Sequence, residues 1–207
     1  MNLPHEFAVA DSETVYLGRV LALRRDQVVM PDGWVAVREV IEHPGAVAIL
    51  PLDDDGSVVM IDQYRHPVGR RIRELPAGLL DTAGEDPLKT AQRELMEETG
   101  YAAREWSVLV DVTPSPGFSD EAVRVFLARG LTEVGRPPSK DDEEADLDVV
   151  RLSLDEAVRQ ALTGEIVNAA TVAGLLAAYA VRTGAAEPRP VDVPWPDRPI
   201  RFAERRG

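Results

Sequence analysis

The sequence predicts an α/β fold, and three observations support this prediction. Strand-like segments lie on both sides of a clearly bounded helix at residues 86–100, and two more helices are indicated between residues 153 and 183. The composition, with 44% hydrophobic and 29% charged residues, is that of a globular protein. A chain of 207 residues can form one good core, or a core with a small appendage. We therefore expect one main domain in which helices pack on a sheet.

Two β-hairpins in succession are predicted before the first helix. Segments 13–30 and 33–43 flank the turn signal Pro31-Asp32-Gly33, and segments 46–52 and 58–66 flank Asp53-Asp54-Asp55-Gly56. Trp34 lies near the first of these turns. Its indole could stack on an adenine, but a core or interface role is expected.

The first helix has both of its end signals. Asp86 is a good N-cap residue, Pro87 suits the first helical position, and Gly100 follows the last turn. We therefore expect this helix to run from residue 86 to residue 100.

Strands and helices alternate less regularly after residue 100. Segments 105–115, 121–131 and 146–154 read as strands. Ser153 to Glu156 resembles a capping box that opens a helix reaching Leu162, and an Ala-rich segment from Val167 to Thr183 predicts another helix. Five prolines between residues 187 and 207 favour an extended arm over a helix.

Several functional classes are made less probable by composition. The chain has no cysteine, so a metal must be held by oxygen or histidine, and the three histidines, His5, His43 and His66, show no metal-ligand spacing. The net charge of −13 disfavours a nucleic-acid surface. No apolar run approaches the roughly 20 residues of a membrane span and no signal peptide is evident, so we expect a cytoplasmic protein with neither membrane nor nucleic-acid partners.

Three carboxylates gather on one arc of the first helix. Glu94, Glu97 and Glu98 are three and four positions apart, beside the apolar stripe that contains Leu95. Like charges at this spacing repel, and a hard cation such as Mg²⁺ would relieve the repulsion while binding substrate phosphates. A solvated acidic face is the alternative, because runs of charge are usually surface.

The segment from Gly78 to Tyr101 resembles the Nudix box, which favours a metal site over a solvated acidic face. The positions that agree in spacing and kind are Gly78, Glu85, Arg93, Glu94, Leu95, Glu97, Glu98, Gly100 and Tyr101. Six residues, where the family has five, separate Gly78 from Glu85, and Tyr101 is aromatic where an aliphatic residue is commoner. The extra residue lengthens the loop before the helix and leaves the register of the carboxylates unchanged.

The resemblance implies a fold and a domain plan. The Nudix fold is an α/β/α sandwich with a mixed sheet, here expected at residues 44–184. A small antiparallel β-domain would precede it at residues 1–43, and the proline-rich arm would follow at residues 185–207. Related enzymes exchange the N-terminal domain between the subunits of a homodimer, so a homodimer is expected here.

The resemblance also implies a metal site. Glu94 and Glu98 correspond to the main ligands of Mg²⁺, with Mn²⁺ as the alternative ion, and Glu97 to a direct or water-mediated ligand. The backbone carbonyl of Ala77 would be a further ligand, and Glu85 and Arg93 would form an ion pair that shapes the loop and helix.

Features outside the box resemble the ADP-ribose-hydrolysing members of the family. Pro116 lies fifteen residues past Tyr101, where a proline marks this subfamily, although Ser-Pro-Gly is also ordinary turn chemistry. Segments 38–50 and 63–78 are similar to it as well, so the resemblance covers most of the chain up to about Arg182. The substrate-binding residues that it implies are Arg65, Arg38, Glu74, Gly117, Phe118 and Asp120.

Basic and acidic clusters complete the expected site. Arg65, Arg70, Arg71 and Arg73 precede the box; Arg65 is the expected phosphate ligand, and at least two of the four are expected to pair with acids or a partner subunit. In the acidic run at residues 141–144, the resemblance implies a glutamate that orients or deprotonates the attacking water, Glu143 first and then Glu144. A solvated loop is the alternative.

The predicted function is hydrolysis of the pyrophosphate of ADP-ribose to AMP and ribose 5-phosphate. A metal-polarised water would attack one phosphorus while the carboxylates of Glu94 and Glu98 hold the metal. Two alternatives remain open. One is a Nudix hydrolase for another nucleoside diphosphate conjugate, such as a nucleotide sugar or a dinucleoside polyphosphate, and the other is a non-catalytic Nudix module that binds a nucleotide.

Overall fold

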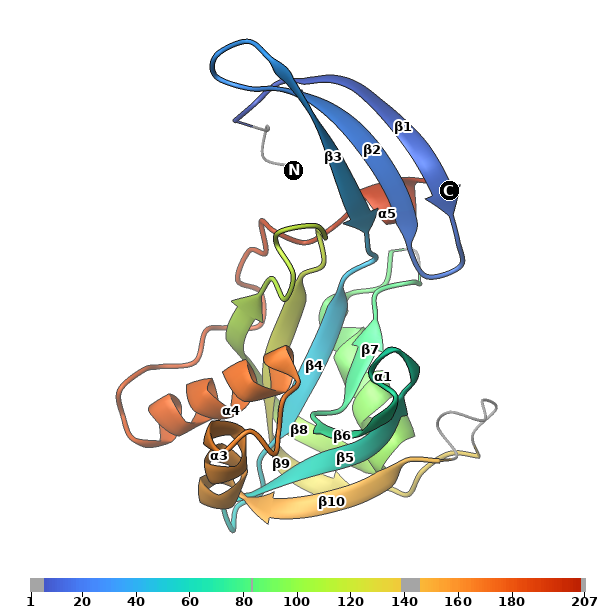
Figure 1. Cartoon of the computed structure of the whole chain (residues 1–207). Coiled ribbons are helices and arrows are strands. Elements are labelled where there is room, and N and C mark those ends of the chain that lie inside the picture. The colour runs from blue at the N-terminus through green and yellow to red at the C-terminus, as the bar shows by residue number, and fades with distance from the viewer. Residues whose placement is uncertain (1–5, 83, 139–145, 206–207) are drawn as a thin grey trace.

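The computed structural model describes residues 6–82, 84–138 and 146–205. Its strands form an N-terminal three-stranded sheet, a second three-stranded sheet and a mixed four-stranded sheet (Figure 1). The strands are β1 (Val9–Leu17), β2 (Ala22–Val29), β3 (Val35–Glu42), β4 (Ala46–Pro51), β5 (Ser57–Arg65), β6 (Arg70–Glu74), β7 (Ala77–Leu79), β8 (Tyr101–Val112), β9 (Val123–Glu133) and β10 (Asp148–Ser153). The helices are η1 (His66–Val68), α1 (Pro87–Thr99), α3 (Leu154–Leu162), α4 (Ala169–Arg182) and α5 (Arg201–Glu204).

The N-terminal sheet has the order β1-β2-β3 and is antiparallel throughout. The predicted hairpin across residues 31–33 is confirmed as β2 and β3, and Gly33 adopts a φ of 86° that suits glycine. The single strand expected at residues 13–30 is wrong, because the chain turns back after Leu17 and forms both β1 and β2. Trp34 is 54% exposed, so it is not a core residue.

The second predicted hairpin is wrong: β4 and β5 lie in different sheets and share only an isolated bridge between Leu52 and Val58. Instead, β4 pairs in parallel with β9 and antiparallel with β7, while β5 pairs with β6 and β10. The strand β4 is buried along nearly its whole length, which suits a central strand covered on both faces. Its two neighbours come from distant parts of the chain, and a local turn signal cannot reveal them.

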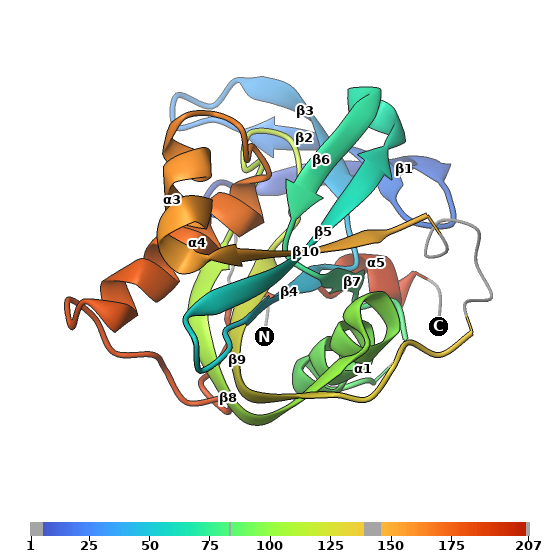
Figure 2. The same cartoon turned by 90° about the horizontal axis from the view of Figure 1, so that it is seen from below.

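Alternate residues of β4 point into two separate cores. Val47 and Ile49 pack with Leu95 of α1, whereas Ala48 and Leu50 pack with Leu175 of α4. The mixed sheet is thus covered by α1 on one side and by α4 on the other, while α3 packs on α4, β5 and β10. This confirms the expected α/β/α sandwich with a mixed sheet (Figure 2). In the described ranges, which omit residues 1–5, 83, 139–145 and 206–207, no helix is long and apolar enough to cross a membrane.

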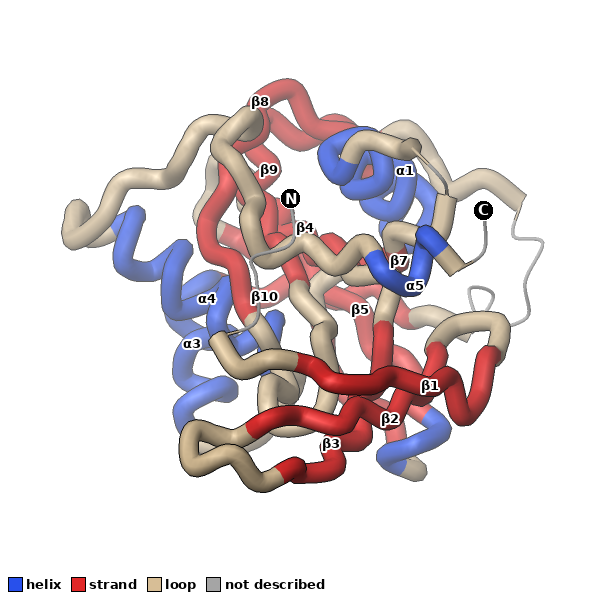
Figure 3. Tube along the Cα trace, turned by 90° about the horizontal axis from the view of Figure 1, so that it is seen from above, coloured by secondary structure: helices blue, strands red, loops and turns tan. Residues whose placement is uncertain are grey.

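The C-terminal arm runs mostly without regular structure from α4 past β8 to α5 (Figure 3). Arg189 exchanges two backbone hydrogen bonds of 2.8 Å with Val108 of β8. The expectation that the arm contains no helix is wrong for residues 201–204, where α5 buries Phe202. Just beyond α5, Arg205 bonds the fully buried carboxylate of Glu42 at the end of β3. The arm therefore contacts both the mixed sheet and the N-terminal sheet.

Candidate active site

The helix α1 places its three carboxylates as the spacing predicts, and its end signals are confirmed. Asp86 accepts a hydrogen bond from the backbone N–H of Leu88, Pro87 is the first helical residue, and Gly100 adopts a left-handed conformation with a φ of 77°. Leu95 is fully buried, so the adjacent positions 94 and 98 lie at the edge of the core.

Glu98 is the most enclosed of the three carboxylates. It is only 6% exposed, and its Oε2 accepts a hydrogen bond of 2.9 Å from the backbone N–H of Ala77 in β7. The pKa of Glu98 is raised to about 8, chiefly by burial and in part by the nearby carboxylates of Glu94 and Glu74, although the Ala77 N–H and Arg65 lower it. The site therefore favours additional positive charge.

Arg93 supplies such a charge to the other two carboxylates. Its Nη1 lies 2.8 Å from Oε1 of Glu94 and 2.8 Å from Oε2 of Glu97. The expected ion pair with Glu85 is confirmed at 3.4 Å, and Glu85 also accepts a hydrogen bond of 2.9 Å from the hydroxyl of Thr90. Within the described segments, no three acidic or histidine side chains converge on one cation position, because Glu94 and Glu97 turn toward Arg93.

Gly78 leaves room for the carboxylate of Glu94. A Cβ at residue 78 would lie 2.1 Å from Oε1 of Glu94, well inside van der Waals contact. Any other residue at this position would push the Glu94 carboxylate away from β7. The glycine of the box thus forms a cradle between β7 and α1, and the oxygen donors around it suit a hard divalent cation such as Mg²⁺ or Mn²⁺.

Replacing Gly78 with alanine should lower metal affinity and kcat/KM by about 10- to 100-fold, the usual effect of disturbing a group that orients a metal ligand. The fold should survive because the clash involves the end of a flexible side chain. Manganese affinity, measured by calorimetry, provides the test. In a Glu94→Ala background the Gly78 change should have no further effect, and an equal loss in both backgrounds would contradict the cradle.

Arg65 and Glu74 lie near the carboxylate of Glu98. They are the last residues of β5 and β6, where Arg65 pairs with Arg70 and Glu74 with Ile61, so the Arg65 side chain reaches back along the hairpin to Glu74. The Nε of Arg65 donates a hydrogen bond of 2.8 Å to Oε2 of Glu74. Glu74 is only 2% exposed, whereas the side chain of Arg65 is 41% exposed. The buried carboxylate therefore orients a guanidinium that still faces solvent, a geometry that suits binding of a phosphate.

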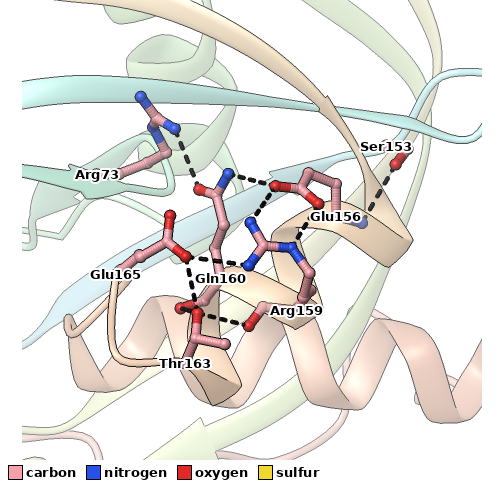
Figure 4. A network of polar contacts seen from close by, with 7 residues as sticks. All are labelled: Arg73, Ser153, Glu156, Arg159, Gln160, Thr163 and Glu165. Atoms are coloured by element: carbon pink, nitrogen blue, oxygen red, sulfur yellow. Dashed lines mark hydrogen bonds and ion pairs between the residues drawn. The ribbon is translucent and has the colours of Figure 1, made fainter.

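The expectation that at least two of the four arginines pair with acids is confirmed. Besides the Arg65 pair, Arg73 bonds Asp62 at 2.7 Å and Arg71 bonds Asp146. Arg73 also donates to Gln160 of α3, whose amide donates in turn to Glu156, so a polar network connects β6 to α3 (Figure 4). The Ser153 side chain caps α3 by accepting from the N–H of Glu156, as the sequence predicts.

A second group of predicted residues lines a separate cleft of about 490 Å³ between the N-terminal sheet and the β8–β9 loop. Arg38, Gly117, Phe118 and Asp120 all border it, together with Pro116. The loop is fixed to β3, since Ile41 donates to the carbonyl of Phe118 at 2.7 Å and Asp120 donates its N–H to the carbonyl of Ile41 at 3.1 Å.

Phe118 is 59% exposed, and Arg38 is also exposed. An aromatic ring and a guanidinium at one cleft are suited to stacking on a nucleobase. Asp120 accepts a hydrogen bond of 2.8 Å from the backbone N–H of His43, while burial raises its pKa. The carboxylates of α1 do not border this cleft.

The structure thus gathers Arg65, Glu74, Ala77, Glu94, Glu97 and Glu98 in one place and Arg38, Gly117, Phe118 and Asp120 in another. Glu143 and Glu144 lie outside the described residues. Sequence reasoning missed Asn168, the N-cap of α4, whose Nδ2 donates a hydrogen bond of 2.6 Å to Oε1 of Glu74. Asparagine before an Ala-rich run is a capping signal, but nothing local in the sequence links residue 168 to residue 74.

The chain is similar to a known protein family and to several characterised proteins. Residues 42–173 match the family model described as NUDIX domain. The chain is 57% identical over 203 residues to the ADP-ribose pyrophosphatase of Mycobacterium tuberculosis, with 98% of each chain covered. It is 39% identical over 170 residues to the ADP-ribose pyrophosphatase of Bacillus subtilis, covering 82% of this chain and 88% of the relative.

A solved structure, entitled "Crystal structure of ADP compounds hydrolase", superposes with a TM-score of 0.75 at 22% sequence identity. The match covers 90% of this chain and 99% of that chain, so the two proteins share the fold. The matched family segment contains every predicted metal-site residue and leaves out most of the N-terminal sheet and all of the C-terminal arm.

Proposed function

Because the chain belongs to the NUDIX domain family, we propose that it hydrolyses the pyrophosphate of ADP-ribose to AMP and ribose 5-phosphate in a reaction that requires a divalent metal. The observation that carries this proposal is the 57% identity, over nearly the whole of both chains, to an ADP-ribose pyrophosphatase. The intact set of box carboxylates on α1 favours an enzyme over a non-catalytic binding module.

Each residue near α1 has a role in this proposal. Glu94 and Glu98 would hold the metal, with Glu97 and the carbonyl of Ala77 as further ligands. Arg93 neutralises Glu94 and Glu97 before the metal binds. When bound, Mg²⁺ or Mn²⁺ would neutralise charge on the diphosphate and lower the pKa of a bound water. Arg65, oriented by Glu74, binds a phosphate oxygen. Glu143, or Glu144 beside it, accepts the proton of the attacking water.

The cleft beside the N-terminal sheet is proposed to bind the nucleoside part of the substrate. Arg38 and the exposed ring of Phe118 can contact adenine, while Gly117 leaves space and Asp120 holds the loop on β3. Since the carboxylates of α1 do not border the cleft of the same chain, a complete site is expected to combine two subunits.

We further propose a homodimer formed through the N-terminal β-domain at residues 1–43. Trp34, Val35 and Val37 are about half exposed on or beside β3, which is unusual for large apolar side chains clustered on one sheet. Light scattering should give twice the chain mass of 22.7 kDa, and a monomer would contradict this arrangement. The proposal also divides the rest of the chain into a Nudix domain at residues 44–184 and an arm at residues 185–207. It places the protein in the cytoplasm, without membrane or nucleic-acid partners.

Incubation with ADP-ribose, with and without Mg²⁺, tests the function. The products are separated by chromatography, and nucleotide sugars and dinucleoside polyphosphates are assayed in parallel. We expect AMP and ribose 5-phosphate only when the metal is present, with ADP-ribose the fastest substrate. Faster cleavage of another diphosphate would show that ADP-ribose is not the preferred substrate, and would leave the proposed metal site unchanged. No turnover of any diphosphate would favour a non-catalytic binding module.

A further inference from the structure

We propose that Asn168, the N-cap of α4, is a positioning residue that sets the phosphate-binding geometry of Arg65 through Glu74. The inference rests on the proposed role of Arg65 as a diphosphate ligand. Both oxygens of the Glu74 carboxylate are used: Oε2 accepts from Nε of Arg65 at 2.8 Å, and Oε1 accepts from Nδ2 of Asn168 at 2.6 Å. The three side chains therefore form one continuous line from α4 to the site.

Burial makes this carboxylate depend on its two donors. Glu74 is only 2% exposed, so water cannot readily replace a lost hydrogen bond. If the amide of Asn168 is removed, Oε1 of Glu74 is left without a donor among the described residues. The carboxylate must then rotate, and Arg65 must follow because its Nε is bonded to it.

The contact with Arg65 leaves part of the guanidinium available for a ligand. Glu74 takes the Nε, and no other hydrogen bond from the Arg65 side chain is found in the described part of the chain. The two terminal nitrogens, on a side chain that is 41% exposed, can therefore present a fork to phosphate oxygens. The direction of this fork is fixed by the Nε bond, and so by the orientation of Glu74.

The N-terminus of α4 provides a rigid base for this arrangement. Oδ1 of Asn168 accepts from the backbone N–H of Thr171 at 2.9 Å, which caps the helix. The hydroxyl of Thr171 accepts from the backbone N–H of Leu75 at 2.9 Å. Two neighbouring residues, Glu74 and Leu75, are thus bonded to the first turn of α4, immediately before the strand β7 that contains Ala77 and Gly78.

Asn168 caps α4 through its side-chain oxygen and bonds Glu74 through its side-chain nitrogen, so a substitution can remove the second contact and keep the first. Serine is as good an N-cap as asparagine but cannot reach Glu74 with a donor, so Asn168→Ser removes only the positioning contact. We expect it to weaken binding of inorganic pyrophosphate, measured calorimetrically with Mg²⁺, by about tenfold, the loss of one hydrogen bond to a charged group. Thermal unfolding and the circular dichroism spectrum should remain close to those of the wild type.

A double-mutant cycle with Arg65→Met distinguishes positioning from a structural role. In the Arg65→Met background, Asn168→Ser should no longer weaken pyrophosphate binding, because the residue acts through Arg65. The matched control is Gln160→Leu, which breaks the contact between α3 and Arg73 of β6 without involving Glu74, and should leave pyrophosphate affinity unchanged.

Three results would overturn the proposal: additive losses in the cycle, an equal loss in Gln160→Leu, or no binding of pyrophosphate to the wild type. These outcomes are distinct from a failure of the proposed function, because the probe is inorganic pyrophosphate. If the wild type binds pyrophosphate through Arg65 but does not cleave ADP-ribose, only the assignment of ADP-ribose as the substrate would be overturned.

Discussion

Replacing Glu98 with glutamine is expected to lower kcat by about three orders of magnitude or more, which corresponds to several kcal/mol of electrostatic stabilisation at the transition state. Glutamine keeps the size of the side chain, and its oxygen can still accept the hydrogen bond from the N–H of Ala77. It has no charge with which to hold a metal. Steady-state kinetics at saturating Mg²⁺, together with a manganese titration, measure both consequences.

The fold should be unaffected by the Glu98 change. In the absence of metal, burial raises the pKa of Glu98 to about 8, so its carboxyl is largely neutral at pH 7 and a neutral amide is a close substitute. A matched control is Glu133→Gln on the exposed end of β9, which should retain wild-type activity. Near-normal turnover by Glu98→Gln would contradict the assignment of this residue as a metal ligand.

Replacing Glu143 with glutamine is expected to lower kcat by about 10²- to 10⁴-fold, the usual contribution of a general base. Glutamine cannot accept the proton of the attacking water. Single-turnover kinetics at several pH values measure the loss. The adjacent Glu144→Gln variant is the control and should behave like the wild type.

The opposite result, a loss in Glu144→Gln alone, would move the role of base to the neighbouring residue. Normal kinetics in both variants would exclude this acidic run from the chemistry. Both residues lie outside the described part of the chain, so this prediction depends on the sequence resemblance.

Elements with strong local signals could be predicted from the sequence. The first helix is bounded as expected because Asp86, Pro87 and Gly100 act on their immediate neighbours. The pairing of β4 could not be predicted in this way. Its partners β7 and β9 are brought to it by packing of α1 and α4 on opposite faces of the sheet, and the turn at residues 53–56 joins two strands that enter different sheets.

In the site, too, local spacing could be predicted from the sequence, whereas contacts between distant segments could not. Fixed spacing predicts that Glu94, Glu97 and Glu98 share an arc of α1, because three- and four-residue separations are neighbours on any helix. It does not predict that Arg93 binds two of them, or that Asn168 reaches Glu74 across 94 positions of sequence. Such contacts depend on side-chain directions that are set only when the layers pack.

The central claim is that the cradle between Gly78 and α1 holds the catalytic metal beside the phosphate ligand Arg65. The most direct test is a crystal structure with Mn²⁺ and a non-hydrolysable methylene analogue of ADP-ribose, with the metal located by its anomalous scattering. We predict manganese bound by Glu94 and Glu98, a phosphate oxygen bonded to Arg65, and adenine in a cleft formed by Arg38 and Phe118. Manganese bound elsewhere, or a diphosphate without contact to Arg65, would contradict the account.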